Sequence, residues 1–171
     1  MRKPRLLQEG ATYHVTARIN RNEFLFKSDT IKKMFLHITE RAKESHSFQL
    51  WNFCIMGNHI HFMIRPTKGE SLSRIMQWIL GVFARMYNRV FNLHGHVWYD
   101  RFKSKVIVSF RQYVNTFVYI AHNPVKAGIV DDPVDYHYSG IACYHKGILG
   151  ILERPPNRIL RILWTRLKKI Q

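Results

Sequence analysis

The chain has 171 residues, with 27 Lys and Arg against 11 Asp and Glu, which gives a formal net charge of +16. Its hydrophobic fraction of 46% is ample for a buried core, so we expect one domain and exclude a largely disordered chain. The positive charge and the 13% of aromatic residues favour a nucleic-acid partner, because cations attract phosphates and aromatic rings stack on unpaired bases. On charge alone, an ordinary basic protein or a ribosome-associated protein stays open.

Cysteine and targeting patterns are those of an intracellular protein. Cys54 and Cys143 are single and lack the paired spacing of zinc or redox sites, so we expect free thiols in a reducing compartment. No uninterrupted apolar run of about 18 residues occurs, which predicts no membrane span. The basic start of the chain is not followed by the apolar segment of a signal peptide. We therefore expect a cytoplasmic protein without a membrane partner.

Hydrophobic periodicity predicts a compact alternation of elements along the chain. A strand at 11–19 is followed by a helix at 30–45, strands at 48–56 and 59–65 joined at Gly57-Asn58, a helix at 71–90, a strand at 105–108 and a helix at 109–123. This order is the one that a ferredoxin-like split βαβ arrangement requires. We expect an α+β fold with a central antiparallel sheet, helices on one face and the other face left for a ligand.

The third predicted strand contains the triplet His59-Ile60-His61. Because side chains alternate along a strand, the two histidines share one face while Ile60, Phe62 and Ile64 point into the core. Two adjacent imidazoles are most stable when both are neutral and share a metal ion. A surface strand that merely carries two histidines is the alternative for so short a motif.

The last predicted helix of this domain places Tyr119 among polar neighbours. At ~100° per residue, several polar side chains lie within roughly 60° of it on the helix surface: Gln112, Asn115, Thr116, His122 and Asn123. Phe110, Phe117 and Ala121 fall on the opposite side and are expected to anchor the helix in the core. Asn123 comes one turn after Tyr119, so its amide can reach the same point as a metal ligand or a hydrogen-bond partner.

Several cationic side chains are candidates for contacts with DNA. His14 and Arg18 lie on the polar face of the first strand, and Arg101, Lys103 and Lys105 precede the Tyr119 helix, where they can hold phosphates. A second histidine pair, at 94 and 96, flanks a glycine in a predicted loop. We interpret these two histidines as polar residues of a surface loop or as DNA contacts rather than as a metal site.

The C-terminal segment forms a separate basic helix in our interpretation. Pro155-Pro156 breaks the preceding structure, and Asn157 can cap a helix that runs to about Ile170. We divide the chain into a domain at 1–150 and a basic helical tail at 151–171. The tail can dock on the domain, lie along DNA or mediate self-association, and its wide apolar side favours docking.

Taken together, these motifs resemble the single-tyrosine HUH transposases, and most closely their REP-associated subgroup. The matching stretches are Tyr13–Thr16, Met56–His61, His96–Ser104 and Tyr119–Gly128, of which the last is the most specific. The resemblance implies the same ferredoxin-like fold. It also implies that His59 and His61 bind a divalent cation, Mg²⁺ or Mn²⁺, with Asn123 near the metal, and that Tyr119 attacks single-stranded DNA to leave a 5′-phosphotyrosine.

For the whole chain we therefore expect cleavage and rejoining of single-stranded DNA at hairpins formed by an extragenic palindromic repeat, in a nucleoid-associated protein of prokaryotic type. One alternative is the transposase of an autonomous mobile element that binds its own terminal hairpins as a dimer. Another is a hairpin-binding protein that has lost catalysis. The sequence leaves monomer and homodimer open, and it leaves open whether His122 assists proton transfer.

Overall fold

The computed structural model describes residue 8 and residues 10–168 of the chain. Four strands and six α-helices form the described part, with short 3-10 turns between them: β1 (Thr12–Arg18), α1 (Asp29–Ser45), β2 (Phe48–Ile55), β3 (His59–Pro66), α2 (Leu72–Phe91), β4 (Lys103–Ile107), α3 (Phe110–Ala121), α4 (Asn123–Lys126), α5 (Gly140–Lys146) and α6 (Asn157–Lys168). No helix within these residues is long and apolar enough to cross a membrane.

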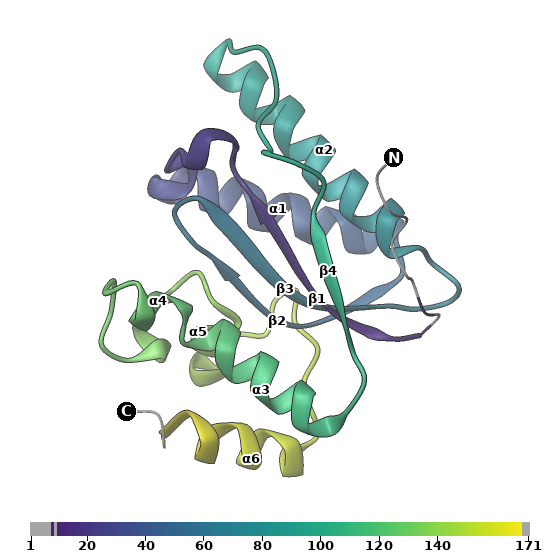
Figure 1. Cartoon of the computed structure of the whole chain (residues 1–171), viewed down its shortest axis with the longest axis vertical. Helices are drawn as coiled ribbons and strands as arrows, with labels where there is room; N and C mark the ends of the chain where they lie inside the picture. The colour runs from purple at the N-terminus through teal and green to yellow at the C-terminus, as the bar shows by residue number, and fades with distance from the viewer. Residues whose placement is uncertain (1–7, 9, 169–171) are drawn as a thin grey trace.

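The strands form one antiparallel sheet in the order β2-β3-β1-β4 (Figure 1). Helix α1 connects β1 to β2, β2 and β3 form a hairpin, and α2 connects β3 to β4, so each helix crosses over a neighbouring strand. This is the ferredoxin-like split βαβ topology, and the predicted α+β fold is confirmed.

Helices α1 and α2 cover one face of the sheet and enclose the larger hydrophobic core (Figure 1). The period-two pattern of β1 and β3 accounts for this face, because Val15, Ile60, Phe62 and Ile64 are fully buried in it. Helix α2 extends past the sheet, so Val90 near its end is exposed although it continues the apolar stripe of the helix.

The opposite face is not left open, which corrects our expectation. Helices α3 and α6 pack over it and form a second core that includes Met63 of β3, a residue with no exposed surface. Tertiary packing decides this point, because alternation along a strand defines two faces but not what covers them. The uncovered part of this face is therefore a cavity at one end of the sheet rather than a broad surface.

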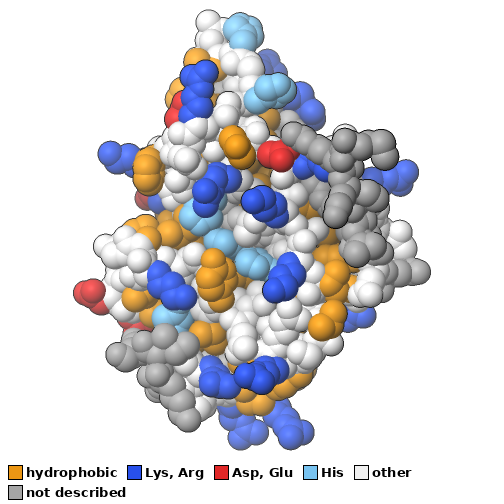
Figure 2. All heavy atoms as spheres, viewed as in Figure 1, with side chains coloured by type: hydrophobic (Ala, Val, Ile, Leu, Met, Phe, Trp, Pro, Cys, Tyr) orange, Lys and Arg blue, Asp and Glu red, His pale blue; other side chains and the backbone are white. Residues whose placement is uncertain are grey.

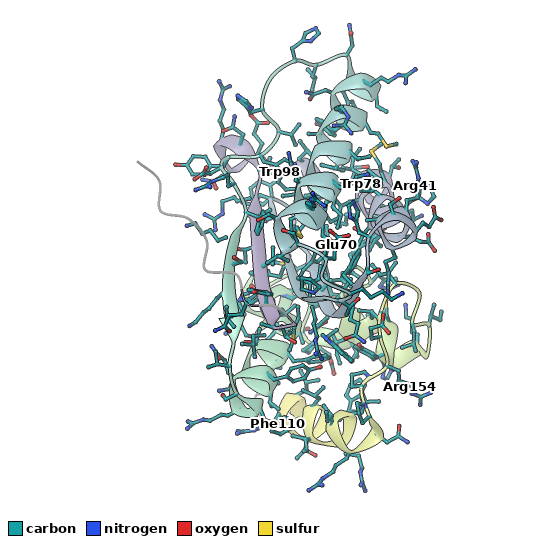
Figure 3. All side chains as sticks on the ribbon, turned by 90° about the vertical axis from the view of Figure 1, so that its right-hand side faces the viewer. Arg41, Glu70, Trp78, Trp98, Phe110 and Arg154 are labelled. Carbon is teal, nitrogen blue, oxygen red and sulfur yellow. The ribbon has the colours of Figure 1, made fainter. Side chains whose placement is uncertain are left out.

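Local differences from the predicted elements concern helix ends. Helix α3 ends at Ala121, and Pro124 lies in the first turn of the separate helix α4, where proline is well tolerated. Phe110 is mostly exposed at the start of α3 (Figure 3), so its predicted anchoring role was wrong.

Strand β4 begins at Lys103, two residues earlier than predicted. Cys54 and Cys143 are both free thiols, as expected.

The basic C-terminal helix docks on the domain. Leu163 and Leu167 of α6 are buried in the same core as Phe117 and Val118 of α3. Residues 169–171 of the predicted helix lie outside the described residues. The division into 1–150 and 151–171 stays a prediction, although α6 packs as part of the domain core.

Candidate active site

Strand pairing brings the candidate histidines and cations onto one face of the sheet. In the register of β1 with β3, Arg18 lies opposite His59 and Thr16 lies opposite His61. In the register of β1 with β4, Thr16 also lies opposite Lys103. Directly paired residues of antiparallel strands point to the same side, so side chains far apart in sequence meet on this face of the sheet, beside Tyr119 of α3.

The three imidazoles of this face are in contact. The ring centroids of His59 and His61 are 4.9 Å apart, and those of His14 and His61 are 5.2 Å apart. His14 Nε2 and His61 Nδ1 share a hydrogen bond of 2.9 Å, and His59 Nδ1 donates to Asn58 Oδ1 at 2.7 Å. These bonds occupy one nitrogen of His59 and one of His61, which leaves Nε2 of each ring for another ligand.

Burial keeps these rings neutral. Desolvation, reinforced by the nearby charges of His59, His14 and Arg18, lowers the pKa of His61 to about 3. Burial also lowers the pKa of His59, with a smaller effect of Arg18, and lowers that of His14, with a smaller effect of Lys105. Neutral imidazole is the form that binds a metal ion.

The donor set fits a divalent cation in part. His61 Nε2 is buried and has no hydrogen-bond partner among the described residues, a costly situation that a metal ligand bond would relieve. Within the described residues, no group of three or more His, Cys, Asp or Glu side chains is arranged to hold a metal. The histidine pair would therefore supply two ligands, and the remaining positions would fall to an amide, water or phosphate oxygens.

Tyr119 of α3 lies over this cluster. Its ring centroid is 5.7 Å from those of both His14 and His61, and the side chain is 42% exposed. The Lys126 ammonium lies 5.1 Å from the centroid of the Tyr119 ring. The phenol is thus held against the imidazoles but remains accessible to a substrate.

A cavity of about 330 Å³ contains most of the predicted site residues. His59, His61 and Tyr119 line it together with the predicted DNA contacts Arg18, Arg101 and Lys103. Figure 2 shows histidine side chains gathered near the middle of this face with Lys and Arg side chains around them. Such a surface attracts a phosphate and would bring it beside the Tyr119 hydroxyl and the imidazoles of His59 and His61.

Four residues that the sequence analysis considered do not line this cavity: His14, Lys105, Asn123 and His122. Lys105 is paired with His14 on the same face of the sheet, further along β4. Asn123 Nδ2 donates to the Tyr119 carbonyl at 2.8 Å, which fixes the amide beside Tyr119. His122 is buried, its Nδ1 bonds to the Val118 carbonyl at 3.1 Å, and it is not part of the cavity, so its position favours packing over proton transfer.

The segment Tyr99–Arg101 forms a wall of the cavity that sequence reasoning did not assign in full. Tyr99 N donates to the Arg18 carbonyl at 2.9 Å, and Trp98 forms a bridge with Ile19, which holds the segment against the end of β1. Asp100 also lines the cavity, and its Oδ1 accepts a hydrogen bond from Arg101 N at 2.7 Å. Only the aromatic and charged composition of 98–101 could have suggested this contribution.

The chain is similar to known proteins in sequence and in fold. The family model described as "Transposase IS200 like" matches residues 8–123, which include every predicted site residue. A Haemophilus influenzae protein assigned to the REP-associated tyrosine transposases is 23% identical over 150 residues, covering 82% of this chain and 83% of that protein.

A solved structure of a REP-associated tyrosine transposase bound to a REP hairpin has the same fold. It aligns with a TM-score of 0.73 and 23% sequence identity over 91% of this chain and 92% of that chain. The predicted resemblance to this group is confirmed in both comparisons. Because the family model covers well over half of its length, the chain belongs to the IS200-like transposase family.

Proposed function

We propose that this protein cleaves and rejoins single-stranded DNA beside hairpins of the REP type, with Tyr119 as the nucleophile and a 5′-phosphotyrosine as the intermediate. Family membership supports a DNA strand-transfer enzyme at the level of the family. The observation that carries the finer proposal is the contact of the Tyr119 ring with His61 at the wall of a cationic cavity.

The cavity residues suit an exchange of phosphodiester bonds. The Tyr119 hydroxyl oxygen attacks phosphorus, the bond from phosphorus to the 3′ oxygen breaks, and the 3′ oxygen takes up a proton as the phenol loses one. Because a phenolate is a better leaving group than a sugar alkoxide, the phosphotyrosine retains the capacity for rejoining. Arg18, Arg101 and Lys103 offset the charge of the bound strand.

A divalent cation, Mg²⁺ or Mn²⁺, would be held by Nε2 of His59 and His61, with Asn123 as a third candidate ligand. When bound, such an ion neutralises the phosphate charge and orients phosphorus for in-line attack. His14 supports this arrangement through its hydrogen bond to His61 Nδ1, which directs the other nitrogen of His61 toward the cavity.

The similar solved structure was determined with a REP hairpin, and we extend that partner to this chain. His14, Arg18, Arg101, Lys103 and Lys105 would supply phosphate contacts, since they border one face of the sheet beside Tyr119. Unpaired nucleotides next to the hairpin are the natural occupants of the cavity, because a duplex does not expose a single strand for in-line attack.

Tyr119, His59 and His61 line one cavity within one chain. A monomer can therefore carry a complete site, which makes a shared dimeric site unnecessary for the chemistry. The hydrogen-bonded imidazoles and the half-exposed phenol also count against a protein that binds hairpins without catalysis.

The direct test is to trap the intermediate. The protein is incubated with Mn²⁺ and a hairpin oligonucleotide that has an unpaired 5′ flank and a radiolabel at its 3′ end, on the side of the cut that stays attached to the tyrosine, then denatured and digested with trypsin. A DNA adduct on the peptide that contains Tyr119 is the expected result. Cleavage without any adduct would point to hydrolysis, and an adduct on another tyrosine would reassign the nucleophile.

A further inference from the structure

A second hollow of about 660 Å³ adjoins the candidate active site. It lies between α2 and the segment that precedes β4, and Tyr99, Asp100 and Arg101 line both cavities. The two hollows are therefore neighbours on either side of one short stretch of chain. No predicted catalytic or metal-ligating residue lines the second hollow.

Gly81 lies in the middle of α2 and forms part of the floor of this hollow. Glycine at the centre of a helix is destabilising relative to alanine. Its backbone has no positive φ that would require glycine, and an added Cβ would meet only the Arg85 guanidinium, at an ordinary contact distance of 3.6 Å. Neither backbone strain nor packing requires glycine here, whereas a side chain would fill the hollow.

The walls suit a flat aromatic ligand. Met76, Leu80, Ala84 and Trp98 give an apolar lining, and Ser73 and Gln77 of α2 add polar groups at its edge. Trp98 lies beside α2 (Figure 3), where its Nε1 donates to the Leu80 carbonyl at 2.9 Å. The indole polar group is thus satisfied within the protein, and its ring contributes apolar surface to the hollow.

The rim carries two guanidinium groups, one acidic residue, Asp100, and an exposed aromatic ring. Arg101 and His96 line the hollow, and the Arg85 guanidinium lies over Gly81. Tyr99, at the boundary of the two cavities, is 72% exposed although it is a large aromatic side chain. Apolar walls with cations around them match a nucleobase attached to a phosphodiester backbone, since bases stack on aromatic rings and phosphates pair with guanidinium groups.

We propose that this hollow binds an unpaired nucleobase of the same DNA strand that Tyr119 attacks. The strand passes over Tyr99–Arg101, with its base against Trp98 and Gly81 and its phosphates beside Arg85 and Arg101. This inference rests on the proposed function and adds a site that positions the strand relative to the nucleophile.

The test compares affinities for a hairpin with a five-nucleotide unpaired flank and for versions in which each flank position in turn is abasic. For wild type, one abasic position should weaken binding about tenfold, in the range of a base stacked on aromatic residues. Gly81→Leu, which fills the hollow with a good helix former, should abolish that tenfold difference. Binding of the hairpin without a flank should stay within about twofold.

Three further variants are compared with Gly81→Leu: a smaller substitution at the same position, a second substitution in the wall of the hollow and a control outside it. Gly81→Ala should raise Tm by about 2–4 °C and weaken flank binding less than threefold, because a methyl group fills little of the hollow. Tyr99→Ala, at an exposed position, should lower flank discrimination without affecting folding. Val90→Leu adds a methylene group to an exposed position of α2 outside the hollow and should behave as wild type.

Each outcome bears on the proposal. If Gly81→Leu and Tyr99→Ala both discriminate as wild type does, or if no abasic position matters in wild type, the hollow does not hold a base and belongs to another kind of ligand. Adduct formation on the same oligonucleotides separates the two proposals. A wild-type adduct with unaffected discrimination in the variants overturns only the base site, whereas the absence of any wild-type adduct overturns the proposed function.

Discussion

His14 of β1 and His61 of β3 are joined side chain to side chain, with Nε2 of His14 2.9 Å from Nδ1 of His61 and the two rings 21° from parallel. The bond fixes the orientation of His61 and leaves its Nε2 as the nitrogen directed to another ligand. Sequence reasoning assigned His14 to DNA binding. Its position in the structure suggests that it also orients a metal ligand.

Replacing His14 by Ala should lower the affinity for Mn²⁺ about ten- to hundredfold, because the supporting hydrogen bond to His61 is lost. Calorimetric titration without DNA measures this effect. His37→Ala, at an exposed position of α1, is the matched control. If His14→Ala leaves metal affinity unchanged but weakens hairpin binding, His14 contacts DNA and does not support a metal ligand.

Replacing either His59 or His61 by Ala should remove metal-dependent cleavage, and the double variant should be no worse than the single ones, because the two rings act as one unit. Single-turnover cleavage of a labelled hairpin measures the loss, and Mn²⁺ titration shows whether it arises from metal binding. Wild-type metal affinity in both single variants would contradict the site assignment.

Tyr119→Phe should abolish cleavage and adduct formation while hairpin affinity stays within about threefold, because the hydroxyl acts in the chemical step. Tyr113→Phe is the control on the same helix. Burial raises the pKa of Tyr113, so its phenolate forms less readily than that of an ordinary tyrosine. If the Tyr119 variant still formed the adduct and the Tyr113 variant did not, Tyr113 would be the nucleophile instead of Tyr119.

Local periodicity alone was enough to predict which face of its strand or helix carries the histidine pair and Tyr119. Alternation along β3 placed His59 and His61 on one face, and helical spacing placed Tyr119 on a polar side of α3; the structure has both features. These are properties of single elements. They do not depend on which other element covers the face.

Features that depend on distant packing were not predictable in this way. Met63 continues the histidine face by alternation, yet it is fully buried because α3 and α6 pack on that part of the sheet. Asp100 enters the cavity through a loop that is held to β1 by backbone bonds, for which sequence offers no periodic signal.

Neutralising Arg101, Lys103 and Lys105 by Gln should weaken binding of every hairpin sequence by similar factors. Each lost phosphate contact should also reduce the slope of log affinity against log salt by about 0.7–0.9. Arg41→Gln on α1 (Figure 3) removes one positive charge, as each of the three substitutions does singly, at an exposed position outside both cavities and is the control for each single variant. A loss confined to one base identity would mean that these side chains read sequence instead.

Asn52 attaches α3, the helix that carries Tyr119, to the sheet. It is fully buried, its Nδ2 donates to the Phe117 carbonyl at 3.0 Å, and its Oδ1 accepts from Phe53 N at 2.9 Å at the irregular pairing between Leu50 and Asn52. Gly140 lies so close to this amide that a side chain there would collide with it. One residue thus connects β2, α3 and the start of α5.

Asn52→Ala should therefore lower the free energy of unfolding by about 2–3 kcal/mol, because the Phe53 N–H is left buried without its partner and a cavity remains. Urea denaturation measures this loss. Asn115→Ala, on the exposed side of α3, should change stability by less than about 0.5 kcal/mol. Because Phe117 precedes Tyr119 by two residues, the folded Asn52 variant should also form the adduct more slowly at saturating hairpin. Normal adduct formation in that variant would mean that the apolar packing of α3 against the sheet and α6 positions the helix without the Asn52 bond.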